Sequence, residues 1–124
     1  MKTVVILVPE LSVMQAIADP QYLFSAVNQF FEMAGKKPLF KVQLVGVKKQ
    51  IKLNSGLYVV HPDLQLKDVK KTDLVIIPAL VGDMAKAIEK NKNLLPWINK
   101  QYANGAEVVS LCVGAFLLAS TGLL

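Results

Sequence analysis

The sequence of 124 residues contains one cysteine, one histidine and no arginine. A single cysteine excludes an intramolecular disulfide, and one Cys with one His gives no spacing for a zinc site. The lack of arginine disfavours a nucleic-acid interface on this chain, because bidentate recognition of guanine and phosphate is mainly an arginine task. The fourteen basic residues behind the net charge of +5 are all lysine, and we expect them to form a solvated surface.

Long apolar runs are also missing, although 53% of the residues are hydrophobic. Pro, Asp, Lys or Gly interrupts each run well before the roughly 20 residues that cross a bilayer. The first run stops at Pro9-Glu10 without a cleavage site, so we expect a first strand there and no signal peptide. We therefore expect a single domain over 1–124 in the cytoplasm, with no membrane partner, no metal and no cofactor.

Apolar segments of strand length alternate with helical patterns along the chain. Residues 3–8, 73–77 and 106–111 are apolar without alternation, which predicts parallel strands covered on both faces, with 106–111 central. A further strand is predicted at 40–47, and Asn54-Ser55-Gly56 predicts a hairpin turn. This order predicts an α/β fold, an open, mostly parallel, flavodoxin-like three-layer sandwich.

The first helix is predicted to start at Asp19-Pro20, which has the form of an N-cap followed by a first helical residue. Gly35 stands where this helix would stop. Apolar residues between them recur at helical spacing, so we expect aromatic members such as Phe30 to pack in the core.

The only cysteine lies in the segment Ser110-Leu111-Cys112-Val113-Gly114, between a predicted strand and a predicted helix. Small residues two positions on either side of a potential nucleophile are typical of a nucleophile elbow, where bulky groups would collide with neighbouring backbone. The sulfur would then lie at the start of a helix, where a thiol is more reactive. The alternative is that Cys112 is an inert, buried small hydrophobe.

Several segments resemble a known superfamily. GAEVVSLCVGAFLLASTGLL is similar to the elbow segment of the ThiJ/PfpI (class I glutamine amidotransferase-like) superfamily, and its GAFLLASTGLL tail resembles the branch fused to AraC-type DNA-binding domains. VVILVPELS, KLNSGLYVVHPD and TDLVIIPALVGD follow the same order upstream. The resemblance covers nearly the whole chain, and it implies that the domain continues past residue 124, so we expect a fragment of a longer chain, incomplete at its C-terminus.

The resemblance implies a crevice at the carboxyl ends of the strands, and in it we expect a ligand site lined by Glu10, Ala79, Leu80, Cys112 and Val113. Cys112 is the one candidate nucleophile. The sequence departs from the catalytic pattern, because Val113 stands where peptidase-like members have His, and the lone His61 lies in the ribbon region. A nucleophile without a base lacks the usual activation.

The resemblance therefore implies a ligand-sensing or dimerisation domain of an AraC-family transcriptional regulator. Its partners would be a small-molecule effector, a second copy in a homodimer, and DNA bound through a downstream domain. Two alternatives remain open. One is a ThiJ/PfpI-type cysteine-dependent enzyme acting on an amide, an isonitrile or a reactive carbonyl, and the other is a redox-sensing thiol protein.

Overall fold

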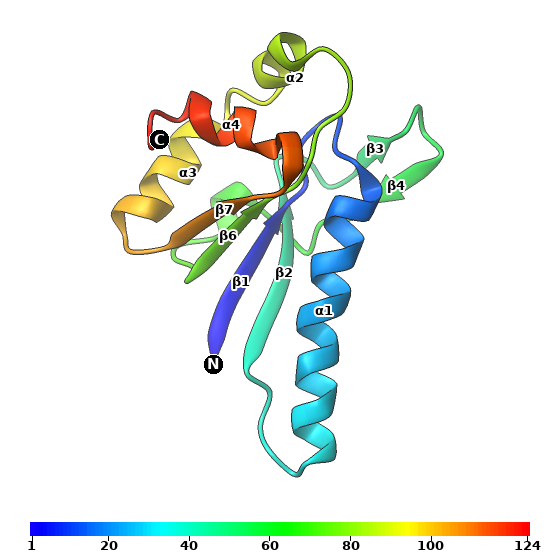
Figure 1. Ribbon diagram of the computed structural model, residues 1–124, viewed down its shortest axis with the longest axis vertical. Helices are drawn as coiled ribbons and strands as arrows, with labels where there is room; N and C mark the ends of the chain where they lie inside the picture. Colours follow the sequence, from blue (N-terminus) through cyan, green and yellow to red (C-terminus); the bar gives the residue numbers. More distant parts are fainter.

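Strand β1 (Lys2–Leu7) is the middle strand of a five-stranded sheet in the computed structural model, which describes residues 1–124 (Figure 1). The strand order is β5-β2-β1-β6-β7, and every pair is parallel. The other strands of the sheet are β2 (Phe40–Gly46), β5 (Leu64–Gln65), β6 (Leu74–Ile77) and β7 (Glu107–Ser110). A separate antiparallel hairpin joins β3 (Ile51–Leu53) to β4 (Tyr58–Val60).

Helices cover both faces of the sheet. The long helix α1 (Met14–Met33) lies with the hairpin on one face, and the other face is covered by α2 (Met84–Lys90), α3 (Leu94–Ala103) and α4 (Ala115–Ser120). Two short 3₁₀ turns, η1 (Leu66–Asp68) and η2 (Cys112–Gly114), complete the chain. The predicted fold class, an open, mainly parallel α/β sandwich, is confirmed.

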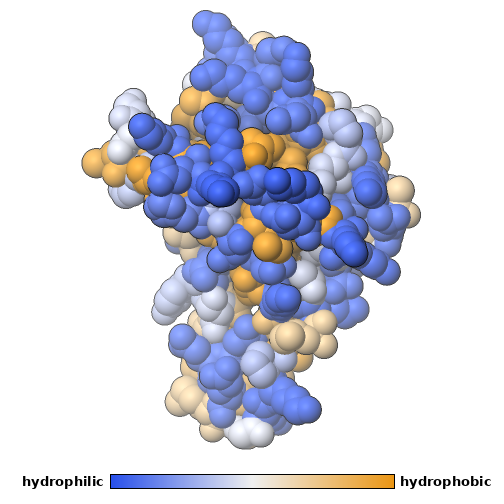
Figure 2. Space-filling model, turned by 180° about the vertical axis from the view of Figure 1, so that it is seen from behind, coloured by the Kyte–Doolittle hydropathy of each residue, from blue (hydrophilic) through white to orange (hydrophobic).

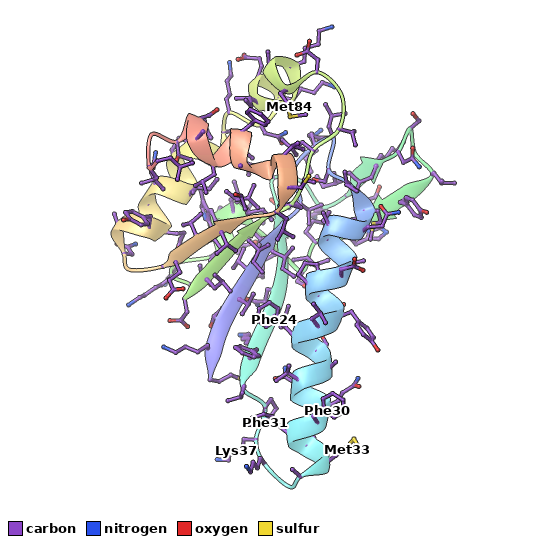
Figure 3. The ribbon with its side chains drawn as sticks, viewed as in Figure 1. Phe24, Phe30, Phe31, Met33, Lys37 and Met84 are labelled. Atoms are coloured by element: carbon purple, nitrogen blue, oxygen red, sulfur yellow. The ribbon has the colours of Figure 1, made fainter.

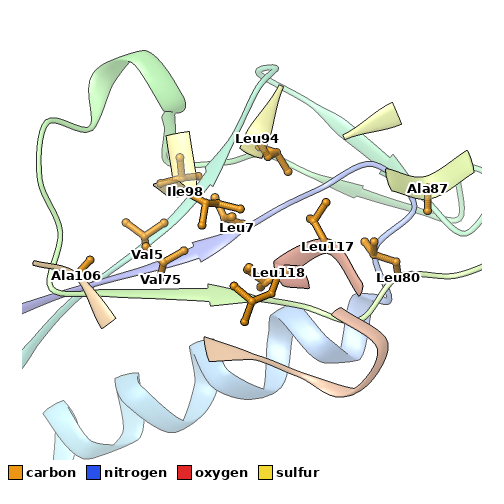
Figure 4. Packing of buried hydrophobic residues seen from close by; sticks show 12 residues of the cluster. Val5, Leu7, Val75, Leu80, Ala87, Leu94, Ile98, Ala106, Leu117 and Leu118 are labelled. Atoms are coloured by element: carbon orange, nitrogen blue, oxygen red, sulfur yellow. The ribbon is translucent and has the colours of Figure 1, made fainter. Parts of the chain in front are cut away.

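The alternating side chains of β1 enter two different cores. Val5 and Leu7 pack in the cluster beneath α2, α3 and α4, together with Leu94, Ile98 and Leu117 (Figure 4). Val4, Ile6 and Val8 pack on the other face, in the cluster that includes Ile17 of α1 and Ile51, Leu53 and Val60 of the hairpin. Because both faces of β1 are buried, its sequence has no polar alternation.

Strand β7 corrects the expectation that 106–111 is central, because β7 is an edge strand that pairs only with β6. Val108 packs against the cluster beneath the three short helices. Val109, which points to the opposite face, is 39% exposed. Although β7 is apolar, only one of its two faces is therefore buried by residues 1–124.

Helix α1 also differs from its prediction. It begins at Met14, and Pro20 lies buried inside it instead of at its start. The backbone N–H of Val13 donates to the carbonyl of Ala79 at 2.9 Å, so a contact with a distant loop sets the start of the helix. The prediction that Phe30 belongs to the core is wrong, because the residue is 67% exposed.

The surface is rich in lysine, and all fourteen lysine side chains are exposed as expected. Figure 2 shows a largely hydrophilic back of the molecule, with apolar atoms visible in patches between the charged groups. None of the helices combines the length and the apolar character that crossing a bilayer requires.

Asn91, at the end of α2, joins this helix to the loop after β1, and it is 2% exposed. Its side-chain oxygen accepts from the Glu10 backbone N–H at 2.8 Å, and its side-chain nitrogen donates to the carbonyls of Glu10 at 2.9 Å and Ala87 at 2.8 Å.

Asn91→Ala should lower the free energy of unfolding by about 2–3 kcal/mol, because it leaves buried backbone groups unpaired. Urea denaturation measures this. Exposed Asn93, which forms no side-chain cap hydrogen bond, is the control, and Asn93→Ala should change stability by less than about 0.5 kcal/mol. Equal effects of the two substitutions would contradict this role of Asn91.

Candidate functional site

Three segments far apart in the sequence meet at the carboxyl ends of the strands. The loop after β1 pairs with the turn after β6 through an isolated bridge between Ser12 and Leu80. The Val81 N–H donates to the Leu11 carbonyl at 2.8 Å beside this bridge. The third segment follows β7, and its Leu111 N–H donates to the Ile77 carbonyl at 2.9 Å. Open parallel α/β sheets bind ligands at this edge.

Cys112 lies where β7 turns into η2, and its side chain is exposed. Its φ of 50° is in the left-handed region, whereas the preceding Leu111 has extended backbone with φ −105°. A non-glycine residue in that region costs about 1–2 kcal/mol. Such strain persists where the surroundings impose it, and it is frequent at functional sites. The turn therefore holds the thiol outward at the end of the sheet.

Gly114 explains why the turn can pack against the sheet. A Cβ added at this residue would lie 2.5 Å from the Pro78 carbonyl oxygen and 2.8 Å from that of Ile77. The φ of Gly114 is −55°, which any residue adopts, so glycine is needed here for space. The small residue two positions after Cys112 thus has the steric role that the sequence pattern predicts.

All five predicted site residues lie in these converging segments. Ala79 and Leu80 are buried, at 8% and 3% exposed, and Leu80 belongs to a core cluster. Val113 is half-buried in η2 beside Cys112. These placements follow from the pairing of Leu80 with Ser12 and from the packing of Gly114 on Pro78.

Glu10 is in the loop after β1, but its carboxylate is bound elsewhere. It forms an ion pair with Lys48, just after β2, with 2.9 Å between Oε1 and Nζ. Glu10 and Lys48 border a hollow of about 310 Å³ that also includes Lys90 and Asn93. No hydrogen bond joins Cys112 to Glu10 or to His61, which is exposed after β4. The structure therefore presents a thiol without a hydrogen-bonded base.

Sequence reasoning missed a hollow of about 250 Å³ near the same end of the sheet. Three elements form it: the start of α1, the turn after β6 and the hairpin. Its lining residues are Ser12, Val13, Met14, Gln15, Asn54, Tyr58 and Val81. The polar residues Asn54 and Tyr58 come from the predicted hairpin, but nothing local in the sequence shows that the hairpin folds back over the start of the first helix.

The lining of the hollow is mixed in character. The apolar residues Val13, Met14 and Val81 border it together with Gln15, Asn54 and Tyr58, which carry amide and hydroxyl groups. The His, Cys, Asp and Glu side chains form no group of three or more that could hold a metal ion.

The geometry defines a class of protein: a parallel α/β domain with a strained, exposed cysteine at a strand-to-helix turn. The model of the DJ-1/PfpI family matches residues 18–124, and the chain belongs to this family. No curated protein matches the chain in sequence.

Solved structures have the same fold. The chain is 25% identical to a candidate transcriptional regulator protein from Vibrio parahaemolyticus, with a TM-score of 0.81 over 99% of this chain and 62% of that one. An AraC family transcriptional regulator from Pseudomonas putida is 18% identical, with a TM-score of 0.71 over 100% of this chain and 63% of that one. Toxoplasma gondii DJ-1 in an oxidised form is 18% identical, with a TM-score of 0.68 over 100% and 63%. The chain thus spans less than two thirds of each of these proteins.

Gly114→Ala should distort the turn that carries Cys112. The added methyl group meets rigid backbone, and we expect a loss of about 2–3 kcal/mol in the free energy of unfolding together with a changed rate of Cys112 alkylation by iodoacetamide. Gly56→Ala is the control. Gly56 has φ 86° with open space around its Cβ position, so this substitution should cost about 1–2 kcal/mol through φ alone and leave the alkylation rate unchanged. A wild-type alkylation rate in folded Gly114→Ala would contradict the steric role of Gly114.

Proposed function

We propose that this chain is the ligand-sensing domain of an AraC-family transcriptional regulator, and that it is part of a longer protein that binds DNA through another domain. The observation that carries the proposal is the turn after β7. It holds an exposed Cys112 with a φ of 50°, while Glu10, the carboxylate of the loop after β1, is paired with Lys48. Such a site is suited to recognition more than to turnover, because the thiol has no base to activate it.

The likeness to two regulators supports the regulatory role. The Vibrio parahaemolyticus protein and the Pseudomonas putida AraC family regulator both have this fold over nearly the whole chain. Both are longer than this chain, which covers 62% and 63% of their lengths. The effector would be a small organic molecule that binds at the carboxyl ends of the strands, between the loop at 9–12, the turn at 78–82 and Cys112-Val113.

Within that region, the hollow bordered by Val81 and Tyr58 offers the effector its polar contacts. Its volume of about 250 Å³ is below the range typical of drug-sized ligand sites, so the effector would be a small metabolite. Cys112 and Val113 do not line this hollow, so an effector would reach them only if it extended beyond it. The turn that exposes Cys112 makes a cysteine-dependent enzyme the main competing function.

Cys112→Ser separates the regulator from the enzyme. Because Cys112 is exposed, iodoacetamide should label it in the folded protein, and the substitution should change the free energy of unfolding by less than about 1 kcal/mol. In the full-length protein, the variant should keep DNA binding in a gel-shift assay. Turnover of amide, isonitrile and dicarbonyl substrates should be negligible with and without the thiol. Turnover that is abolished by Cys112→Ser would show an enzyme and overturn the proposal.

Val81→Phe tests the hollow. Val81 borders it and is 44% exposed, so a larger side chain would fill the space without disturbing the core. A compound found by thermal-shift screening of the full-length protein should bind the variant at least about tenfold more weakly, as measured by calorimetry. Val59→Phe is the matched control, since Val59 is 43% exposed on β4 and does not border the hollow. Equal weakening by both substitutions, or by neither, would place the ligand elsewhere.

A further inference from the structure

A hollow of about 390 Å³ lies at the amino ends of the strands, at the other end of the sheet from Cys112. Figure 1 shows this end, where β1 and β2 begin, away from α2. Three lysines from two segments border the hollow: Lys41 of β2, and Lys70 and Lys71 of the loop before β6. Asp68 is the only carboxylate on its border, so positive charge is in excess there. We call it the lysine hollow.

The sheet face that borders the lysine hollow changes from apolar to polar along the strands. Leu7 and Val45, which are register partners near the carboxyl ends of β1 and β2, are buried beneath α2, α3 and α4. Thr3 and Lys41 are register partners on the same face at the amino ends, and Gln43 follows Lys41 on that face. A face of a parallel sheet that helices cover is normally apolar. The three polar residues therefore mark the part of this face where the core ends, and all three border the hollow.

The loop that carries Lys70 and Lys71 is held to the rest of the fold by hydrogen bonds. Gln101 of α3, which is 1% exposed, accepts from the Thr72 N–H at 3.2 Å and donates to the Lys70 carbonyl at 3.5 Å. The Thr72 hydroxyl donates to the Thr3 carbonyl at 3.0 Å. These bonds fix the loop backbone beside the start of β1. A ligand that binds both lysines would therefore have to order little more than their side chains.

The cationic groups of the lysine hollow have no partner within the chain. Lys41, Lys70 and Lys71 form no ion pair, and the Asp68 carboxylate accepts from the Gln65 N–H at 3.0 Å. The backbone N–H groups of Lys70 and Lys71 also donate to no group of the chain. Charges of one sign that line a concavity raise the local concentration of counter-ions. The hollow thus offers unpaired charges and donors to an anion.

We propose that the lysine hollow binds a small molecule that carries phosphate groups, through the ammonium groups of Lys41, Lys70 and Lys71. An ammonium group binds phosphate as a point charge with three N–H donors, so this site does not need arginine. A volume of about 390 Å³ is within the range typical of small-molecule sites. The concave shape and the lack of arginine favour a small molecule over a nucleic-acid strand. The site lies apart from the proposed effector hollow and does not depend on the regulator function.

Calorimetric titration of the full-length protein with sodium pyrophosphate, at constant ionic strength, tests the binding. Lys41→Gln combined with Lys71→Gln should weaken binding at least about tenfold, because two of the three cationic groups are lost. Lys37→Gln removes the same kind of charge and is the matched control. Lys37 is exposed beside the end of α1 and does not border the lysine hollow, so its loss should leave the affinity unchanged (Figure 3). Absence of binding at millimolar pyrophosphate, wild-type affinity in the double variant, or equal weakening by Lys37→Gln overturns the proposal.

Lysine acetylation locates the bound anion and separates a small molecule from a nucleic acid. The full-length protein is acetylated with an N-hydroxysuccinimide ester, with and without pyrophosphate, and the modified lysines are identified by peptide mass spectrometry. Pyrophosphate should lower the acetylation of Lys41, Lys70 and Lys71 several-fold and leave that of Lys37 unchanged. Equal protection of all lysines, or none at these three, would contradict the site. Protection of the three by duplex DNA but not by pyrophosphate would assign the hollow to nucleic acid and also overturn the proposal.

Discussion

Val4 to Val8 leave neither face of β1 open to water, and the rest of the architecture follows from this burial. Side chains on one face require α2, α3 and α4 as cover, and those on the other require α1 and the hairpin. Parallel strands need a crossover between each pair, so covering segments alternate with strands along the chain. The carboxyl ends of the strands then meet at one edge, where the loops can form a crevice.

Backbone contacts at that edge determine what the site can do. The turn after β6 is joined to the loop after β1 by the Val81 to Leu11 hydrogen bond, and the β7 turn packs closely on Pro78 through Gly114. These contacts hold Cys112 outward in a strained conformation. The side chain of Asn91 binds the Glu10 backbone, and Lys48 binds its carboxylate. The scaffold thus exposes a thiol that has no hydrogen-bonded base.

Local sequence was enough for the order of strands and helices, because apolar runs and the Asn54-Ser55-Gly56 turn depend on residues that are close together in the chain. It was also enough for the steric role of Gly114, which the spacing around Cys112 encodes. Tertiary structure alone decided which apolar residues are buried. Phe30 and Val109 are apolar residues of the kind that is common in cores, but whether they are buried depends on which elements pack against them. Tertiary structure also determined where α1 begins, which residue pairs with Glu10 and where the hollow beside Tyr58 forms, since each depends on contacts between residues far apart in the chain.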